Sequence, residues 1–221
     1  MREIVLDTET TGLSPKSGHR VVEIGCIELV NLVPTGESYH AYIDPERDMP
    51  AEAFNVHGLS EEFLHGHSTF DKIVDGFLDF VEGGRLVIHN AQFDLGFLNA
   101  ELDRLGKPEL ANDFVDTVAL ARKKFPGAQA NLDALCRRFG IDNSAREKHG
   151  ALLDAELLAE VYLELTGGKQ PGLTFSNAKA AEENVQAQST ARPERSFAAN
   201  DEEIAAHDAF VEKIDDPIWR Q

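Results

Sequence analysis

The stretch REIVLDTE, residues 2–9, decides the fold. Its apolar run, Ile4 to Leu6, has no polar residue in alternation, which is typical of a strand buried on both faces of a sheet. Asp7 and Glu9 close the run and, two residues apart on a strand, leave it on the same face. The sequence therefore places an acid pair at the carboxyl edge of a sheet, where α/β proteins tend to bind ligands.

Strand and helix patterns alternate on either side of this stretch, through residues 1–168. Strand patterns fall at residues 21–30, 37–43, 85–90 and 114–117, with a hairpin loop around Pro34 and Gly36. Helical spacing of apolar residues falls at residues 70–81, 92–105, 117–125, 132–140 and 151–168. This order predicts one α/β domain over residues 1–168, with a mixed sheet flanked by helices.

The chain changes character after residue 168. Residues 176–200 contain only two large apolar side chains, so burial cannot offset the entropy of ordering them, and we expect a flexible linker. Helical spacing returns at residues 201–214. A single amphipathic helix has no core of its own to pack on, which favours a docking segment at 201–221. Its contact residues would be Ile204, Phe210, Val211, Ile214 and Trp219.

Composition narrows the classes of function. The 221 residues include 21 Lys and Arg against 39 Asp and Glu, a net charge of −18. This charge repels polyanions and argues against a basic-stripe binder of nucleic acid, although bound divalent cations invert the field locally. We expect no membrane span and no signal peptide. Cys26 and Cys136 belong to no paired motif, so we expect neither a disulfide nor a zinc site, and a reduced cytoplasmic setting.

Two further acids follow the ends of apolar segments. Asp94 lies four residues after Asn90, a suitable N-cap, and Asp154 lies near the start of the last helix of the domain. Taken singly, each is also explained as a partner of its helix dipole. Four carboxylates that converge with Asp7 and Glu9 would repel one another without a cation. An all-oxygen set predicts Mg²⁺ or Mn²⁺ rather than zinc.

His149 precedes Asp154 by five residues. On one helix the two side chains would diverge by roughly 140°, so His149 must lie on the preceding loop if both face one centre. A histidine in this place is often a surface or capping residue. Beside a polyacid metal site, it suits the role of a general base.

Three stretches that carry these residues resemble the motifs of the DEDDh exonuclease family: Asp7-Thr8-Glu9-Thr10-Thr11-Gly12, Asn90-Ala91-Gln92-Phe93-Asp94 and His149-Gly150-Ala151-Leu152-Leu153-Asp154. Within this family, the sequence closely resembles the epsilon (proofreading) subunits of bacterial DNA polymerase III. It implies a ribonuclease H-like fold with a five-stranded mixed sheet. It also implies that the four acids bind two divalent cations and that His149 is the general base.

The resemblance further implies a reaction. Two cations would activate a water and stabilise the leaving oxygen while His149 takes the proton, so that the 3′-terminal phosphodiester of DNA is hydrolysed and a 5′-mononucleotide is released. The implied contacts to the terminal nucleotide are Asp7, Glu9, Thr10, Leu13, His57, Asn90 and Asp154. We assign Phe93 to core packing and Asp116 to a strand–helix junction.

The tail carries two more resemblances. Segment 169–175 contains a Gln-x-x-Leu-x-Phe pattern, formed by Gln170, Leu173 and Phe175, that resembles a sliding-clamp-binding motif. Segment 201–221 resembles the part of epsilon subunits that binds the polymerase (alpha) subunit. The family also implies a small third subunit on the outer face of the domain, and a replisome-associated bacterial protein.

Two alternatives stay open. The first is a free-standing DEDDh RNA exonuclease, which would have little use for a clamp motif or a docking helix. The second is a non-catalytic assembly subunit between polymerase and clamp, which the complete set of acids and histidine argues against.

Overall fold

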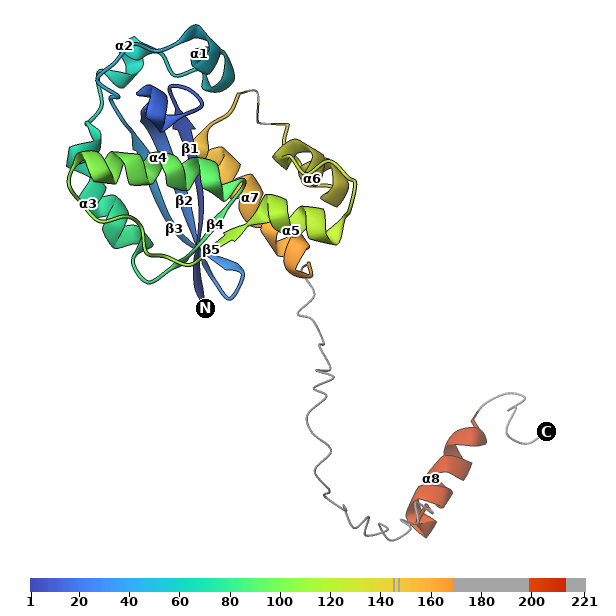
Figure 1. The fold of residues 1–221 in the computed structure, drawn as a ribbon. Helices are drawn as coiled ribbons and strands as arrows, with labels where there is room; N and C mark the ends of the chain where they lie inside the picture. Colours follow the sequence, from blue (N-terminus) through green and yellow to red (C-terminus); the bar gives the residue numbers. More distant parts are fainter. Residues whose placement is uncertain (145, 147, 169–198, 214–221) are drawn as a thin grey trace, which may run out of the picture. The chain divides into compact units, whose positions relative to one another are not determined.

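The computed structural model describes residues 1–144, 146, 148–168 and 199–213 (Figure 1). Its sheet has the strands β1 (Arg2–Thr10), β2 (Val21–Val30), β3 (Val33–Tyr42), β4 (Arg85–Ile88) and β5 (Phe114–Asp116), in the order β3-β2-β1-β4-β5. β1 pairs antiparallel with β2 and parallel with β4. One isolated bridge, between Asp44 and Thr69, lies outside these strands. The predicted α/β class with a mixed sheet is confirmed.

The helices of this body are α1 (Ala51–His57), α2 (Glu61–Leu64), α3 (Phe70–Val81), α4 (Ala91–Arg104), α5 (Thr117–Lys124), α6 (Leu132–Phe139) and α7 (Ala151–Thr166), with a short 3₁₀ turn η1 (Pro15–Ser17). The last five α-helices lie where the apolar spacing predicts them. α1 and α2 are additions, because they are too short to show a helical period. No helix among the described residues is long and apolar enough to cross a bilayer.

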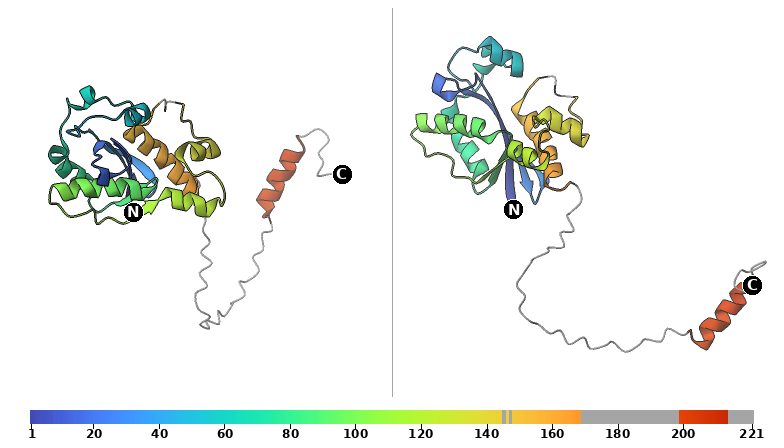
Figure 2. Two further views of the ribbon diagram at one scale, coloured as in Figure 1. Left: turned by 45° about the horizontal axis from the view of Figure 1, so that its top comes forward. Right: turned by 45° about the vertical axis from the view of Figure 1, so that its right-hand side comes forward.

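The two faces of β1 feed two separate cores. Ile4 and Leu6 pack with side chains of α3 and α4, whereas Val5 packs with those of α5, α6 and α7. Figure 2 shows the sheet between these two groups of helices. Both faces are covered, which explains why the strand reads as an uninterrupted apolar run.

The β2–β3 hairpin differs from the sequence expectation. Its turn is the pair Asn31 and Leu32, with φ of 53° and 67°, and Pro34 and Gly36 lie inside β3 rather than in the loop. Positive φ at both central residues is what a type I′ hairpin turn requires. Asn-Leu lacks the glycine that usually signals this turn, and β3 is an edge strand, where a proline is tolerated.

The carboxyl half of β1 extends past its neighbour β4. Leu6 pairs with Ile88, the last residue of β4, so that Asp7 to Thr10 continue beyond it. There the Thr8 N–H and hydroxyl both donate to Asp94 Oδ1, at 3.0 and 2.7 Å. These bonds fix the first turn of α4 against the acid pair of β1.

Gly25 allows α7 to begin directly on the sheet. It lies opposite Asp7 on β2, and a Cβ at this position would be 2.3 Å from the backbone of Ala151 and Leu152. The first turn of α7, which contains Asp154, therefore lies beside the acids of β1.

The C-terminal helix α8 spans Asp201–Val211. Asn200 and Glu203 form a reciprocal capping box at its start, and the expected helix is confirmed over these residues. Ile204 and Phe210 are exposed, whereas Val211 is buried. The remaining predicted tail contacts, Gln170, Leu173, Phe175, Ile214 and Trp219, lie outside the described residues.

We expect Gly25→Ala to lower the free energy of unfolding by about 1–3 kcal/mol, because the new methyl group must push α7 away from the sheet. Urea denaturation followed by circular dichroism measures this change. Gly96→Ala is the matched control: Gly96 lies on α4 with open space at its Cβ position, so the same substitution there should be neutral or stabilising. Equal stability of the two variants would contradict the close approach of α7.

Candidate active site

The structure brings together the five residues that the sequence singles out for chemistry. They line one cleft of about 270 Å³. Asp7 and Glu9 come from β1, Asp94 from the first turn of α4, Asp154 from the first turn of α7, and His149 from the loop before α7. Residues up to 147 positions apart in the chain (154 − 7) thus share one centre.

Three of the five residues are close enough to bind one common metal ion. Glu9, His149 and Asp154 each offer an atom, and these atoms lie within 4.8 Å of one another. Glu9, Asp94 and Asp154 are buried, whereas His149 is exposed at the mouth of the cleft. This donor set, rich in carboxylate oxygens, suits a hard divalent cation.

Burial and mutual repulsion shift the pKa values of the acids on β1 and α4. Burial, with the neighbouring acids, raises the pKa of Glu9 to about 8 and that of Asp7 well above its usual range. Burial raises the pKa of Asp94 to about 7, although the hydrogen bonds from Thr8 oppose the shift. These carboxyl groups hold protons at neutral pH unless a positive charge compensates them.

Arg146 supplies a positive charge that the sequence reading missed. Its guanidinium makes two bonds to Asp154, at 2.5 and 2.6 Å, and one to Asp133 at 2.8 Å. Its Nη2 also lies 2.6 Å from Nδ1 of His149. Burial alone would raise the pKa of Asp154, but the bonds from Arg146 and His149 lower it. No motif marks Arg146, because a loop rather than a helix or strand delivers it.

A second hollow of about 430 Å³ adjoins the acid cleft and shares Glu9 and Phe93 with it. Thr10, Leu13 and His57 line this hollow, as the resemblance implies, and Leu13 is 86% exposed. Phe93 packs against the core as predicted but also separates the two hollows, a role that the sequence reading missed.

His57 presents a neutral imidazole to this second hollow. Its Nδ1 accepts the Leu59 N–H at 3.0 Å, which leaves the proton of the neutral ring on Nε2. Nε2 is buried and has no well-formed hydrogen bond among the described residues. Burial lowers the pKa of His57 to about 4, outweighing the backbone of Thr10. His57 is thus a hydrogen-bond donor without charge.

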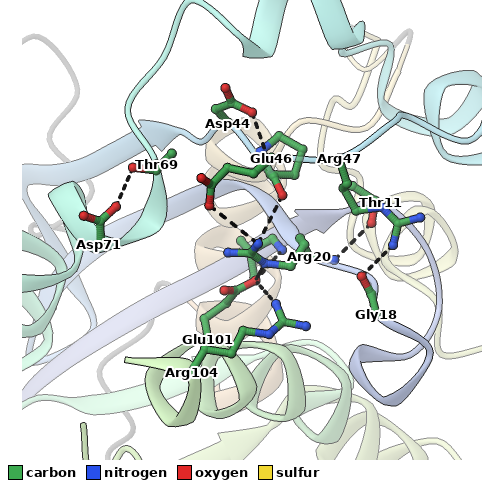
Figure 3. A network of polar contacts seen from close by, with 12 residues as sticks. Thr11, Gly18, Arg20, Asp44, Glu46, Arg47, Thr69, Asp71, Glu101 and Arg104 are labelled. Atoms are coloured by element: carbon green, nitrogen blue, oxygen red, sulfur yellow. Dashed lines mark hydrogen bonds and ion pairs between the residues drawn. The ribbon is translucent and has the colours of Figure 1, made fainter. Parts of the chain in front are cut away.

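A network around Arg20 holds the loop that carries Leu13 (Figure 3). Arg20 Nε donates to the buried carboxylate of Glu101 on α4 at 2.7 Å, and Arg104 donates to the same oxygen at 3.1 Å. The Arg20 N–H donates to the Thr11 hydroxyl at 3.0 Å, and Arg47 donates to the carbonyl of Gly18 at 2.5 Å. Both ends of this loop are therefore fixed to the domain.

Asn90 is not brought to these hollows. It is exposed and lines a separate hollow with Asp116 and Arg122, at the start of α4. It does cap α4, with φ of 69°, but without a side-chain cap bond. Asp116 caps α5 by accepting from the Val118 and Ala119 N–H groups, as the sequence predicts for a strand–helix junction.

Known proteins match both the sequence and the fold. The family described as "Exonuclease" (RNase_T) matches residues 4–162. The DNA polymerase III subunit epsilon of Rickettsia felis is 53% identical over 189 residues, covering 84% of this chain and 82% of that protein. The one from Escherichia coli is 44% identical over 238 residues, covering 99% and 97%.

A solved structure supports the fold at lower identity. The nuclease domain of 3′hExo, a DEDDh family member bound to rAMP, superposes with a TM-score of 0.65 at 18% identity, covering 75% of this chain and 91% of that one. The family match spans most of the domain, and the two relatives align over 84% and 99% of this chain. This chain therefore belongs to the exonuclease family and, within it, to the epsilon subunits of DNA polymerase III.

Proposed function

We propose that this chain is the 3′–5′ proofreading exonuclease of a bacterial replicative polymerase, and that it removes mispaired nucleotides from the 3′ end of DNA as 5′-mononucleotides. The observation that carries the proposal is the convergence of four carboxylates and one histidine in a cleft beside a hollow of nucleotide size.

The residues of the acid cleft have two roles in this reaction, cation binding and proton transfer. Asp7, Glu9, Asp94 and Asp154 would hold two divalent cations, which would supply activation of water and stabilisation of the leaving 3′ oxygen. His149, at the mouth of the cleft, takes the proton of the attacking water. Attack on the terminal phosphodiester breaks the P–O3′ bond, and the shortened strand leaves with a free 3′ hydroxyl.

The electrostatics of the cleft support a cation requirement. Carboxyl groups with raised pKa values become anionic at neutral pH only when positive charge neutralises their repulsion. Oxygen donors without a thiolate favour Mg²⁺ or Mn²⁺ over softer metals. Arg146 covers part of this need at Asp154, and a cation bound there would compete with it.

The adjoining hollow fits the terminal nucleotide. Leu13 offers an exposed apolar side chain, His57 an uncharged donor, and Thr10 a hydroxyl oxygen whose proton is donated to the Gly12 carbonyl; this set suits a base and sugar rather than a phosphate. A base can enter only after it leaves its partner, so a mismatched end, which frays more readily, is the preferred substrate.

Segments of the tail bind the partner proteins. The polymerase subunit binds residues 201–221, with Ile204 and Phe210 exposed on α8 for this contact. The sliding clamp binds Gln170, Leu173 and Phe175, and a small third subunit covers the outer face of the domain. With a net charge of −18, the chain depends on these contacts to stay near DNA.

The first experiment uses a 5′-labelled DNA primer with a paired or a mismatched 3′ end. We expect stepwise shortening with Mg²⁺, faster on the mismatch, and none with chelator. His149→Ala should reduce kcat by about 100-fold or more, since general-base catalysis contributes that much. Asp7→Asn, which removes a cation ligand, should also reduce kcat strongly. Lys72→Met, at an exposed side chain of α3, is the control. Faster cleavage of an RNA strand would revive the free-standing RNA exonuclease, and no cleavage with the polymerase present would favour the assembly subunit.

The pKa values predict an inverted pH dependence of stability. The metal-free folded protein binds protons at Glu9 and Asp94 more tightly than the unfolded chain does, so its stability should fall as pH rises from 5 to 8. Thermal unfolding with chelator measures this fall, and millimolar Mg²⁺ or Mn²⁺ should remove it. Glu9→Gln should flatten the metal-free profile. Equal stability at both pH values would contradict the burial of repelling acids.

Deletion of residues 169–221 separates catalysis from docking. We expect the remaining domain to hydrolyse a nitrophenyl ester of thymidine 5′-phosphate as fast as the full chain, but not to co-purify with the polymerase subunit. The double variant Leu173→Ala, Phe175→Ala should lose binding to the sliding clamp and keep binding to the polymerase subunit. Tight polymerase binding by the truncated domain would show that docking resides elsewhere.

A further inference from the structure

The helix α1 belongs to the hollow proposed for the terminal nucleotide. Ala53, Val56 and His57 of α1 line that hollow, together with Pro50 and Glu52 at its start. A nucleotide seated there would contact the helix along its length, so that occupancy of the hollow restrains α1.

The same helix holds the loop that carries His149. The His149 N–H donates to the carbonyl of Val56 at 3.2 Å, a bond between residues far apart in the sequence. Lys148 places its Nζ 4.9 Å from the ring centroid of Phe54, within cation–π range. Its side chain also packs on Gly58, where a Cβ would lie 2.7 Å from Lys148 Cδ.

These contacts make α1 the support of the histidine's backbone. His149 precedes α7, whose N-cap is Gly150, so no helical hydrogen bond of α7 holds the His149 N–H. On its side-chain flank the imidazole Nδ1 faces Arg146 and Asp154. The histidine thus has one support in the acid cleft and another on the wall of the nucleotide hollow.

Resting on the proposed function, we propose that Phe54 and Lys148 are positioning residues that couple filling of the nucleotide hollow to alignment of His149. A terminal nucleotide that enters the hollow fixes α1, and α1 fixes the loop through Val56, Phe54 and Gly58. A 3′ end that stays paired leaves the hollow empty, and His149, the general base, is then poorly held. Selection of frayed ends then occurs in the catalytic step as well as in binding.

The test compares Phe54→Leu and Lys148→Met with the control Lys72→Met. This control removes a lysine that is 71% exposed and that forms an ion pair, within the described part of the chain, with its neighbour Asp71. Phe54→Leu keeps an apolar side chain but loses the ring. Lys148→Arg should keep the cation–π contact with Phe54 and therefore the wild-type kcat. On the mismatched primer we expect kcat to fall about tenfold in both test variants, because His149 is misplaced rather than lost. KM should change less than twofold, and the melting temperature should not change.

A second readout does not depend on turnover. Amide exchange at His149, followed by NMR, should slow when thymidine 5′-monophosphate and Mg²⁺ are added to the wild-type protein, and much less in the two test variants. Wild-type kcat in both variants, or exchange at His149 that ignores the nucleotide, would overturn the coupling. A wild-type protein that binds nucleotide but never shortens DNA would instead refute the proposed function, and the exchange measurement would still decide the coupling.

Discussion

Repulsion between buried carboxylates is the constraint on which this structure depends. Asp7 and Glu9 lie near the end of β1, whose residues from Glu3 to Leu6 are buried, so the acids cannot turn away from one another without breaking the sheet. The neighbouring contacts accommodate this cost: Thr8 donates twice to Asp94, and Arg146 holds Asp154. These contacts hold the acids together, and a bound cation would relieve their repulsion.

The same constraint accounts for an enzyme of DNA with a strongly negative charge. In the proposed function, the acid cleft would bind phosphate through cations, and the adjoining hollow would bind base and sugar through Leu13 and the uncharged His57. Neither site needs a basic surface. Long-range attraction to the strand is absent from such a design, which is consistent with a tail that binds other proteins.

The sequence predicts what periodicity and local chemistry determine. Strand β1, the five longer helices of the domain and the four acids follow from apolar spacing and from motifs in order. The hairpin turn at Asn31-Leu32 escapes because positive φ is imposed by strand twist rather than signalled by glycine. Arg146 and Glu101 escape for another reason: their partners are set by tertiary packing, which brings a loop to α7 and α4 to the start of β2.

The distribution of the acids along the chain also has a consequence for synthesis. The strand with Asp7 and Glu9 leaves the ribosome first, but Asp154 arrives with α7, which closes the sheet beside Gly25. At about 5–20 residues per second, the intervening chain takes several seconds or more to emerge. Throughout that time the nascent protein lacks both His149 and Asp154. A nuclease built this way can become active only when its domain is almost complete.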